Sequence, residues 1–341
     1  YRRQRQMCIR DSYKGEEPAE YAAILPTRYE HTEGYHIEPA DSISAVLEQF
    51  YASRSLYTRM RQKSVDLRKI VSTHLERSSK KLDLQLKQLK DTEKRDKFKV
   101  YGELLNTYGY QVTEGAKSVE VPNYYTGEML TIPLDETLSP LDNAKKYFAR
   151  YNKLKRTFEA LNTQTEETRT EIAHLQTIQA ALAIAESEDD LAQIRDELET
   201  YGYIRRKMNG KKKQKSKSKP FHYRSSDGFD IYVGKNNFQN DELTFKVANG
   251  NDWWFHAKGM PGSHVIVKTE GRELPDRTFE EAGRLAGYYS SGRDNEKIEI
   301  DYLQRKNVKK PNSAVAGYVI YYTNYSLTIH PDISGIEKIS E

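Results

Sequence analysis

Residues 41–98 contain neither glycine nor proline, and this uninterrupted run limits the possible folds more than any other feature of the chain. Apolar side chains recur through the run at helical spacing, as at Leu82 and Leu86. Asp41 or Ser42 can cap the first turn, because a short polar side chain accepts a hydrogen bond from the exposed amides there. The run therefore predicts one helix much longer than a globular average.

A second helical run begins near Pro140 and has a clearer period. Apolar or small residues alternate at spacings of three and four, with one gap at Gln179: Leu154, Phe158, Leu161, Thr165, Thr168, Ile172, Leu175 and Leu182. This spacing is typical of a coiled-coil seam. Two such runs most simply pair as an antiparallel hairpin of about 60 Å or more at 1.5 Å per residue, although pairing between chains remains open.

Residues 100–140, between the two runs, predict a small β-containing tip. After a short helix, the alternating stretches "SVEVPNYY" and "MLTIPLD" flank the turn Thr126-Gly127, as in a β-hairpin. The tip is expected to cap the helix ends or to contact a partner.

A basic segment separates the helices from the rest of the chain. After a short helix that ends at Gly202, residues 205–220 contain nine Lys or Arg and no acidic residue. Such a segment repels itself and predicts a flexible linker. It can act as a plain tether or contact phosphate, and the candidate phosphate contacts are Arg205, Arg206, Lys211, Lys212 and Lys213.

The remaining sequence predicts a compact domain over residues 221–332. Stretches such as "FDIYVG", "LTFKVA", "SHVIVK", "KIEIDY" and "GYVIYY" have the pattern of strands, and a capping box from Thr278 to Glu281 predicts one helix. The fold class is therefore α+β: a long antiparallel coiled-coil hairpin with a β-containing tip, then a mixed α+β domain. The expected boundaries are a foreign leader at 1–12, an amino-proximal end at 13–41, the coiled coil at 42–204 and the linker at 205–220.

Motifs for catalysis or for a cofactor are not found in the sequence. The chain has one cysteine, neither a P-loop nor a dinucleotide fingerprint, and no apolar run long enough to span a membrane. His256 and His264 form a weak metal pair, and Ser263, His264 and Asp252 lie too close in sequence to indicate a hydrolase triad. We expect a cytoplasmic, non-enzymatic protein with no cofactor, metal or membrane.

Charge and amide side chains favour nucleic-acid binding by the second part of the chain. Residues 201–341 hold 24 Lys and Arg against 17 Asp and Glu. In "NDWWFHAKGMPGSHVIVK", strand alternation would place Trp253 with Phe255 and Trp254 with His256. One tryptophan is then expected in the core and the other beside a turn that approaches RNA.

The alternatives to RNA contact are structural. The segment "KNNFQND" can be a turn before a helix capped by Asn240 or Asp241, and the loop "RKNVKK" can be mere surface charge. The predicted RNA contacts are Lys235, Asn236, Gln239, Asn240, Trp254, His256, Lys258, Ser263, His264, Lys306, Lys309 and Lys310.

The stretch from "SSDGFDIYVGKNNFQNDELTFKVANGNDWWFHAKGMPGSHVIVK" to "KKPNSAVAGYVIYY" resembles the carboxy-terminal domain of the NFACT family. Members of the family are called RqcH or fibronectin-binding protein A-like in bacteria and NEMF in animals. "VPNYYTGEMLTIPLD" and "SPLDNAKKYFARYNKLKR" resemble the family's middle domain, so that the resemblance covers roughly residues 20–330.

The resemblance implies a role in ribosome-associated quality control. Its implied partners are the large ribosomal subunit and its rRNA, stalled peptidyl-tRNA, and the tRNA recruited for carboxy-terminal alanine tailing. Most of the family's amino-terminal domain has no counterpart here, so the chain is expected to bind without tailing by itself. The alternative, suggested by the older family name, is a surface adhesin that binds fibronectin.

Overall fold

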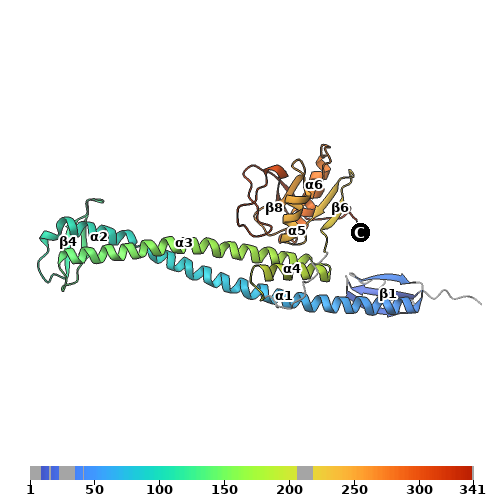
Figure 1. Ribbon diagram of the computed structural model, residues 1–341, viewed down its shortest axis with the longest axis horizontal. Coiled ribbons are helices and arrows are strands. Elements are labelled where there is room, and N and C mark those ends of the chain that lie inside the picture. The colour runs from blue at the N-terminus through green and yellow to red at the C-terminus, as the bar shows by residue number, and fades with distance from the viewer. Residues whose placement is uncertain (1–8, 15–16, 23–34, 41, 206–217, 340–341) are drawn as a thin grey trace, which may run out of the picture. The chain divides into compact units, whose positions relative to one another are not determined.

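The computed structural model describes residues 9–14, 17–22, 35–40, 42–205 and 218–339. The chain divides into two compact units, one formed by residues 74–175 and the other by residues 1–73 together with 176–341. The predicted α+β class and the helical hairpin are confirmed (Figure 1). None of the described helices has the length and apolar character needed to cross a membrane.

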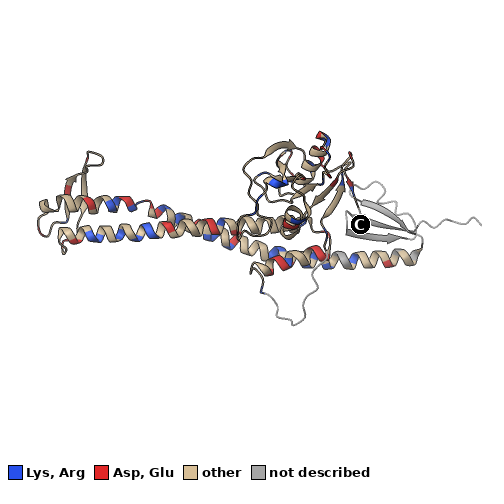
Figure 2. Cartoon of the chain, turned by 45° about the horizontal axis from the view of Figure 1, so that its top comes forward, with Lys and Arg blue, Asp and Glu red and all other residues tan. Residues whose placement is uncertain are grey.

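The unit 74–175 contains the second part of α1 (Ile43–Thr92) and most of α3 (Pro140–Ile184), which run antiparallel (Figure 1). Positions seven apart on α1 are buried although they are polar: Ser78, Gln85 and Thr92. Leu86, which the sequence pattern favoured, is 38% exposed, because it lies one residue beyond this seam. On α3, Thr165 and Thr168 are buried at the predicted seam positions. Basic and acidic residues are interspersed along both helices (Figure 2).

The tip has a small core of its own. Helix α2 (Arg95–Tyr108) leads through a 3₁₀ turn (Gly109–Gln111) to the hairpin of β4 (Ser118–Pro122) and β5 (Met129–Pro133). The two strands pair antiparallel, and the predicted turn places Gly127 at a φ of 75°, a conformation that glycine adopts without strain. Apolar side chains of α2, the hairpin and the first turns of α3 pack together: Tyr101, Leu104, Leu105, Val121, Ile132 and Ala144. The predicted β-hairpin is therefore confirmed.

The other unit begins with a three-stranded antiparallel sheet in the order β2-β1-β3. Its strands are β1 (Ile9–Lys14), β2 (Glu17–Ala22) and β3 (Tyr35–Ala40). The first residues of β1 fall in the segment 1–12, the expected leader. Helix α1 then starts after Ser42, whose hydroxyl accepts the amide of Ala45 at 3.2 Å.

Helix α4 (Glu188–Thr200) follows α3 and starts with a capping box. The Ser187 hydroxyl accepts the amide of Asp190, and the Asp190 carboxylate accepts the Ser187 amide in return. The helix ends before Gly202, which has a φ of 80°.

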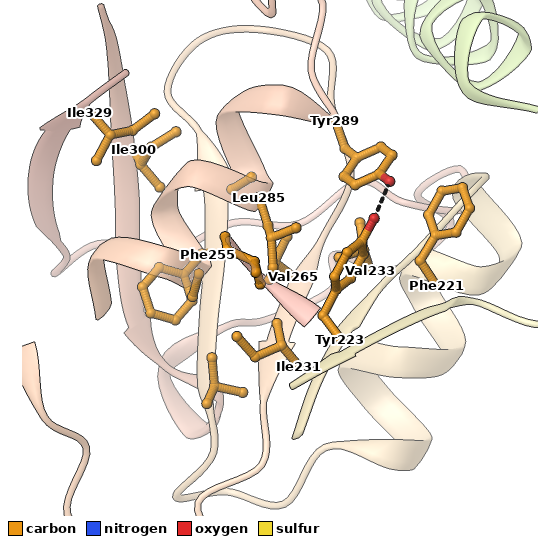
Figure 3. Packing of buried hydrophobic residues seen from close by; sticks show 14 of the residues in the cluster. Phe221, Tyr223, Ile231, Val233, Phe255, Val265, Leu285, Tyr289, Ile300 and Ile329 are labelled. Carbon is orange, nitrogen blue, oxygen red and sulfur yellow. Dashed lines mark hydrogen bonds between the residues drawn. The ribbon is translucent and has the colours of Figure 1, made fainter. Parts of the chain in front are cut away.

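The carboxy-terminal domain is built on a seven-stranded antiparallel sheet in the order β11-β10-β8-β9-β7-β6-β12. The strands are β6 (Phe221–Arg224), β7 (Asp230–Val233), β8 (Trp253–Ala257), β9 (Val265–Val267), β10 (Ile298–Gln304), β11 (Tyr325–Ile329) and β12 (Glu337–Lys338). Helix α6 (Asp276–Tyr288) packs on one face of the sheet. Between them lies the main core, where the buried Tyr223 and Tyr289 hydroxyls share a hydrogen bond of 2.5 Å (Figure 3).

Two stretches predicted as strands have other structures. "LTFKVA" forms a π-helical turn (Leu243–Val247) after the short helix α5 (Asn237–Glu242), because this turn buries Leu243 while Lys246 and Val247 face solvent. "GYVIYY" forms only an isolated bridge between Lys309 and Ile320. The strand β11 begins after it.

The predicted capping box of α6 is wrong. The helix starts at Asp276, two residues before Thr278. The Thr278 hydroxyl instead lies 2.7 Å from a carboxylate oxygen of Asp227, and the Glu281 carboxylate accepts the amide of Ser226 at 2.9 Å. Both buried side chains therefore fasten the turn between β6 and β7 to the helix.

Candidate nucleic-acid interface

The two adjacent tryptophans of β8 face opposite sides of the sheet, as strand alternation predicts. Trp253 packs against Phe279 of α6, with ring centroids 4.9 Å apart, and is only partly buried. Trp254 is 0% exposed and belongs to a second, smaller core with Leu243, Leu303 and others. Trp254 is thus the core tryptophan, and its ring is closed to any stacking base in this conformation.

Two histidines share the face of Trp254. The ring centroid of His256 lies 5.6 Å from those of Trp254 and His264, and His264 Nδ1 is 2.8 Å from the Thr244 hydroxyl. Burial lowers the pKa of His256 to about 4, and burial followed by the neighbouring His256 lowers the pKa of His264 well below its ordinary value. Both rings are therefore neutral near pH 7 and supply no positive charge for phosphate.

The catalytic and metal alternatives do not assemble here. Asp252 accepts hydrogen bonds from Lys268 Nζ at 2.5 Å and from the Thr269 amide at 2.9 Å, whereas His264 is engaged with Thr244. Ser263 is buried, and its amide donates to the carbonyl of Tyr289. Across the described parts of the chain, no three His, Cys, Asp or Glu side chains are grouped as metal ligands would be.

The amide-rich segment before α5 docks onto helix α4. Lys235 Nζ lies 3.2 Å from a carboxylate oxygen of Asp190, and the Asn236 side-chain amide donates to Gln193 at 2.7 Å. Gln239 also donates to Gln193, at 2.9 Å.

The same segment also orders its own turn. Asn236, rather than Asn240 or Asp241, caps α5 by accepting the amide of Gln239 at 3.0 Å, and Asn240 accepts the amide of His264. Asn236, Gln239 and Asn240 are buried. Their polar groups are thus satisfied within the chain.

The exposed members of the predicted set are four lysines. Lys258 lies 3.1 Å from Glu299 in an ion pair, and Lys310 pairs with Asp241. Lys306 and Lys309 are exposed, and neither forms an ion pair within the described residues. Their charge is available to phosphate.

Three loops carry exposed lysines, Lys306 and Lys309 among them, together with exposed aromatic rings. Residues 243–250, 305–310 and 318–322 all pack on the second core, through Leu243, Phe245, Ala248, Val308, Val319 and Tyr321. Backbone hydrogen bonds of 2.9 and 2.8 Å between Lys309 and Ile320 join two of the loops. Arg305 Nε donates a hydrogen bond to the carbonyl of Thr244 at 2.7 Å and so joins the loop 305–310 to the loop 243–250.

We call five exposed side chains of these loops the Lys/Tyr surface: Lys246, Lys306, Lys309, Tyr318 and Tyr322. Tyr318 is 47% and Tyr322 83% exposed. Sequence reasoning missed both tyrosines and Lys246, because they fall in stretches expected to be strands. The available signal was the tyrosine-rich "GYVIYYTNY" that follows the basic loop. Lysines near exposed rings are the combination that binds single-stranded nucleic acid.

The positive charge of the domain is local. Residues 221–341 hold 15 Lys and Arg against 17 Asp and Glu, so the excess counted over 201–341 comes from the basic segment. In that segment, Arg205 is exposed, whereas Arg206, Lys211, Lys212 and Lys213 lie outside the described residues. A phosphate-binding surface on the folded domain must therefore be a patch, such as the Lys/Tyr surface.

Comparison with known proteins places the chain in a family. Residues 2–217 match the NFACT N-terminal and middle domains, and residues 219–321 match the NFACT protein RNA binding domain. The chain belongs to the NFACT family. The Lys/Tyr surface thus lies almost entirely within the region that matches the family's RNA-binding domain.

Relatives of this NFACT chain include bacterial proteins described as Rqc2 homolog RqcH. The protein from Streptococcus suis (strain 05ZYH33) is 38% identical over 300 residues, 88% of this chain and 54% of the relative, and the protein from Bacillus subtilis (strain 168) is 35% identical over 305 residues. The chain therefore spans about half the length of these relatives.

A solved structure of the C-terminal part of the fibronectin/fibrinogen-binding protein from Streptococcus suis is also similar to this NFACT chain. It has a TM-score of 0.65 and 33% identity, and covers 83% of this chain and 100% of that one.

Proposed function

We propose that the chain is an RNA-binding and ribosome-binding factor of ribosome-associated quality control, and that the Lys/Tyr surface contacts the RNA. The observation that carries the proposal is the joining of three loops on one buried core, which brings the loop of Lys306 and Lys309 next to the loop of the exposed Tyr318 and Tyr322. The lysines can neutralise phosphates, while the rings can stack on unpaired bases. RNA loops and ends offer both groups at once.

The finer proposal follows the family. We infer that the RNA belongs to the large ribosomal subunit that carries stalled peptidyl-tRNA, and that the chain helps to recruit tRNA for carboxy-terminal alanine tailing. The names of the RqcH relatives support this assignment. In this proposal the compact domain 221–332 contacts RNA, and the long coiled coil 42–204 extends along the ribosomal subunit. The basic segment with Arg205, Arg206 and Lys211–Lys213 adds non-specific attraction to phosphate.

The test is co-sedimentation with isolated large subunits over a salt series, with and without peptidyl-tRNA. The variant K306Q/K309Q removes two exposed charges of the Lys/Tyr surface. Its affinity is expected to fall about tenfold, and the slope of log affinity against log salt to shrink by about 1 to 2, because each lost phosphate contact removes about one counterion.

The matched control is K297Q/R277Q, which also removes two exposed positive charges, but outside the Lys/Tyr surface. Its affinity should change less than twofold, as expected for charges that contact no phosphate. Equal losses in the two variants would show that only net charge matters, and the proposed surface would be abandoned. Y322A provides a further check, because it should weaken binding without changing the salt slope.

A second candidate function is binding of fibronectin. It is favoured by the description of the structural relative from Streptococcus suis as a fibronectin/fibrinogen-binding protein. Purified chain would be tested against immobilised fibronectin beside large subunits, and the cytoplasmic and surface fractions of intact cells would be compared. A purely external pool of the protein, with binding of fibronectin that K306Q/K309Q leaves unchanged, would favour the adhesin and contradict the ribosomal proposal.

A further inference from the structure

A groove of about 560 Å³ lies between helix α6 and strand β11, away from the Lys/Tyr surface. Phe279 of α6 and Tyr302 of β10 form its aromatic wall, and Leu327 and Ile329 of β11 line it further. This volume lies within the range of pockets that hold a small ligand or several side chains of a peptide. We call it the acidic groove, for the charges described below.

The wall of the groove continues into exposed aromatic surface. The ring centroids of Phe279 and Tyr302 are 5.3 Å apart, and Tyr302 stacks on Tyr325 at 5.5 Å with an interplanar angle of 29°. Tyr325 is 62% exposed, and Trp253 lies 5.8 Å from Tyr302 on the same side of the sheet. The faces of such rings attract cations, arginine and lysine side chains above all.

The charges at the groove are predominantly negative. Asp276 and Glu280 stand one turn apart on α6, both exposed, and neither forms a hydrogen bond or an ion pair with any other described residue. Arg284, the cation of the lining, is engaged: its guanidinium donates to the carbonyls of Asp332 and Ser334 and lies 3.6 Å from the Asp332 carboxylate. Two carboxylates are therefore left without a counter-charge.

The negative charge of Asp276 acts on the aromatic wall. Burial, then Tyr325 and then Asp276 raise the pKa of the Tyr302 hydroxyl above its ordinary value. A phosphate brought to the same place would be repelled, whereas a cation would gain both the carboxylates and the ring faces. Charge complementarity therefore selects a basic protein segment and excludes RNA.

We propose that the acidic groove binds a Lys- or Arg-rich segment of a partner protein, with one basic side chain over the exposed ring of Tyr325 and another facing Asp276 and Glu280. This site is separate from the Lys/Tyr surface and does not depend on the proposed RNA contact. It would let one domain bind the RNA and the basic protein parts of the same assembly through different surfaces.

The experiment measures fluorescence anisotropy of a labelled twelve-residue peptide of alternating Arg, Lys and Gly, added to the full chain. A Glu-substituted peptide and a short single-stranded RNA serve as comparison probes. D276N/E280Q is expected to weaken binding of the basic peptide about tenfold, and Y325A about threefold, from the loss of two weak ion pairs and one cation–π contact. RNA binding by the same variants should not weaken.

The matched control is D294N/E296Q, which removes two exposed carboxylates from the turn before β10. It should change peptide affinity less than twofold. Equal weakening by D294N/E296Q and D276N/E280Q would mean unspecific attraction and would overturn the site, as would failure of the parent chain to bind the basic peptide.

Folding of the variants is checked by tryptophan fluorescence, and Y325A, which alters an exposed side chain, keeps the test decisive if D276N/E280Q does not fold. If the peptide binds only after Lys211, Lys212 and Lys213 are changed to Gln, the chain's own basic segment competes for the groove and is its occupant. That result would overturn the proposal of a partner protein.

Discussion

Lowering the pH from 6.5 to 5 should destabilise the carboxy-terminal domain through His256 and His264. Both rings lie beside Trp254, where burial lowers the pKa of His256 to about 4 and that of His264 well below its ordinary value. In the unfolded chain both rings take up protons near pH 6.5. The unfolded state therefore binds more protons over this range, and the free energy of unfolding falls as the pH falls.

The size of this effect follows from proton linkage. Between pH 6.5 and 5, each ring that stays neutral in the folded state costs about 1.6 kcal/mol of stability, or about 3 kcal/mol for the pair. Carboxylates titrate mostly below this range, so the histidines should account for most of the change. Asp301 pairs with His256 across β8 and β10, and its negative charge raises the pKa of His256. Burial, which lowers that pKa, has the larger effect.

The assay is guanidinium unfolding at several pH values, followed by tryptophan fluorescence. Both tryptophans of the chain lie in β8, so the signal reports on the carboxy-terminal domain alone. H256Q should remove about half of the pH dependence, whereas H330Q, which changes an exposed ring, should leave it intact. A stability that is level between pH 6.5 and 5, or an H256Q slope equal to that of the parent chain, would refute the reasoning.

Two further perturbations test the packing of the domain. D190N, K235M and the double variant form a double-mutant cycle in the same unfolding assay. The coupling free energy between the two residues should be about 1 to 3 kcal/mol, because the two charges meet in a buried site. A coupling below about 0.5 kcal/mol would contradict the docking of α4. Gly317→Ala should cost more than the roughly 1 to 2 kcal/mol of a left-handed residue, because a Cβ at Gly317 (φ 77°) would stand 2.5 Å from Asn237 Oδ1. Gly228→Ala (φ 79°), with no atom within 4 Å, is the control, and equal costs for the two variants would show that the contact is harmless.

The long helices and the tip could be predicted because their signals are local. Ser42 caps α1 within three residues, and the turn at Gly127 joins two strands that adjoin it in sequence. The capping box at Thr278 was wrong for the opposite reason. Thr278 and Glu281 found partners about 50 residues away, in the turn between β6 and β7, and nothing in the sequence near α6 shows that turn.

The candidate site was predicted less well, because amide and lysine side chains suit protein and RNA equally. Asn236 and Lys235 have the chemistry of an RNA contact, but helix α4 lies more than 40 residues earlier in the sequence and presents Gln193 and Asp190 to them. Tyr318 and Tyr322 were missed because alternation in "GYVIYY" predicts a strand, whereas the segment forms a loop held by one bridge.

The alternation of β8 gives the two adjacent tryptophans different roles. Trp254 belongs to the second core, on which the loops of the Lys/Tyr surface pack. Trp253 contacts Phe279 and Tyr325, the aromatic rings at the acidic groove. The two surfaces need opposite fields, since phosphate requires positive charge and a basic peptide requires negative charge. The domain has nearly equal numbers of basic and acidic residues, so it can offer both fields only where the two kinds of charge are separated in space. The Lys/Tyr surface and the acidic groove lie on opposite sides of the sheet, and this arrangement separates them.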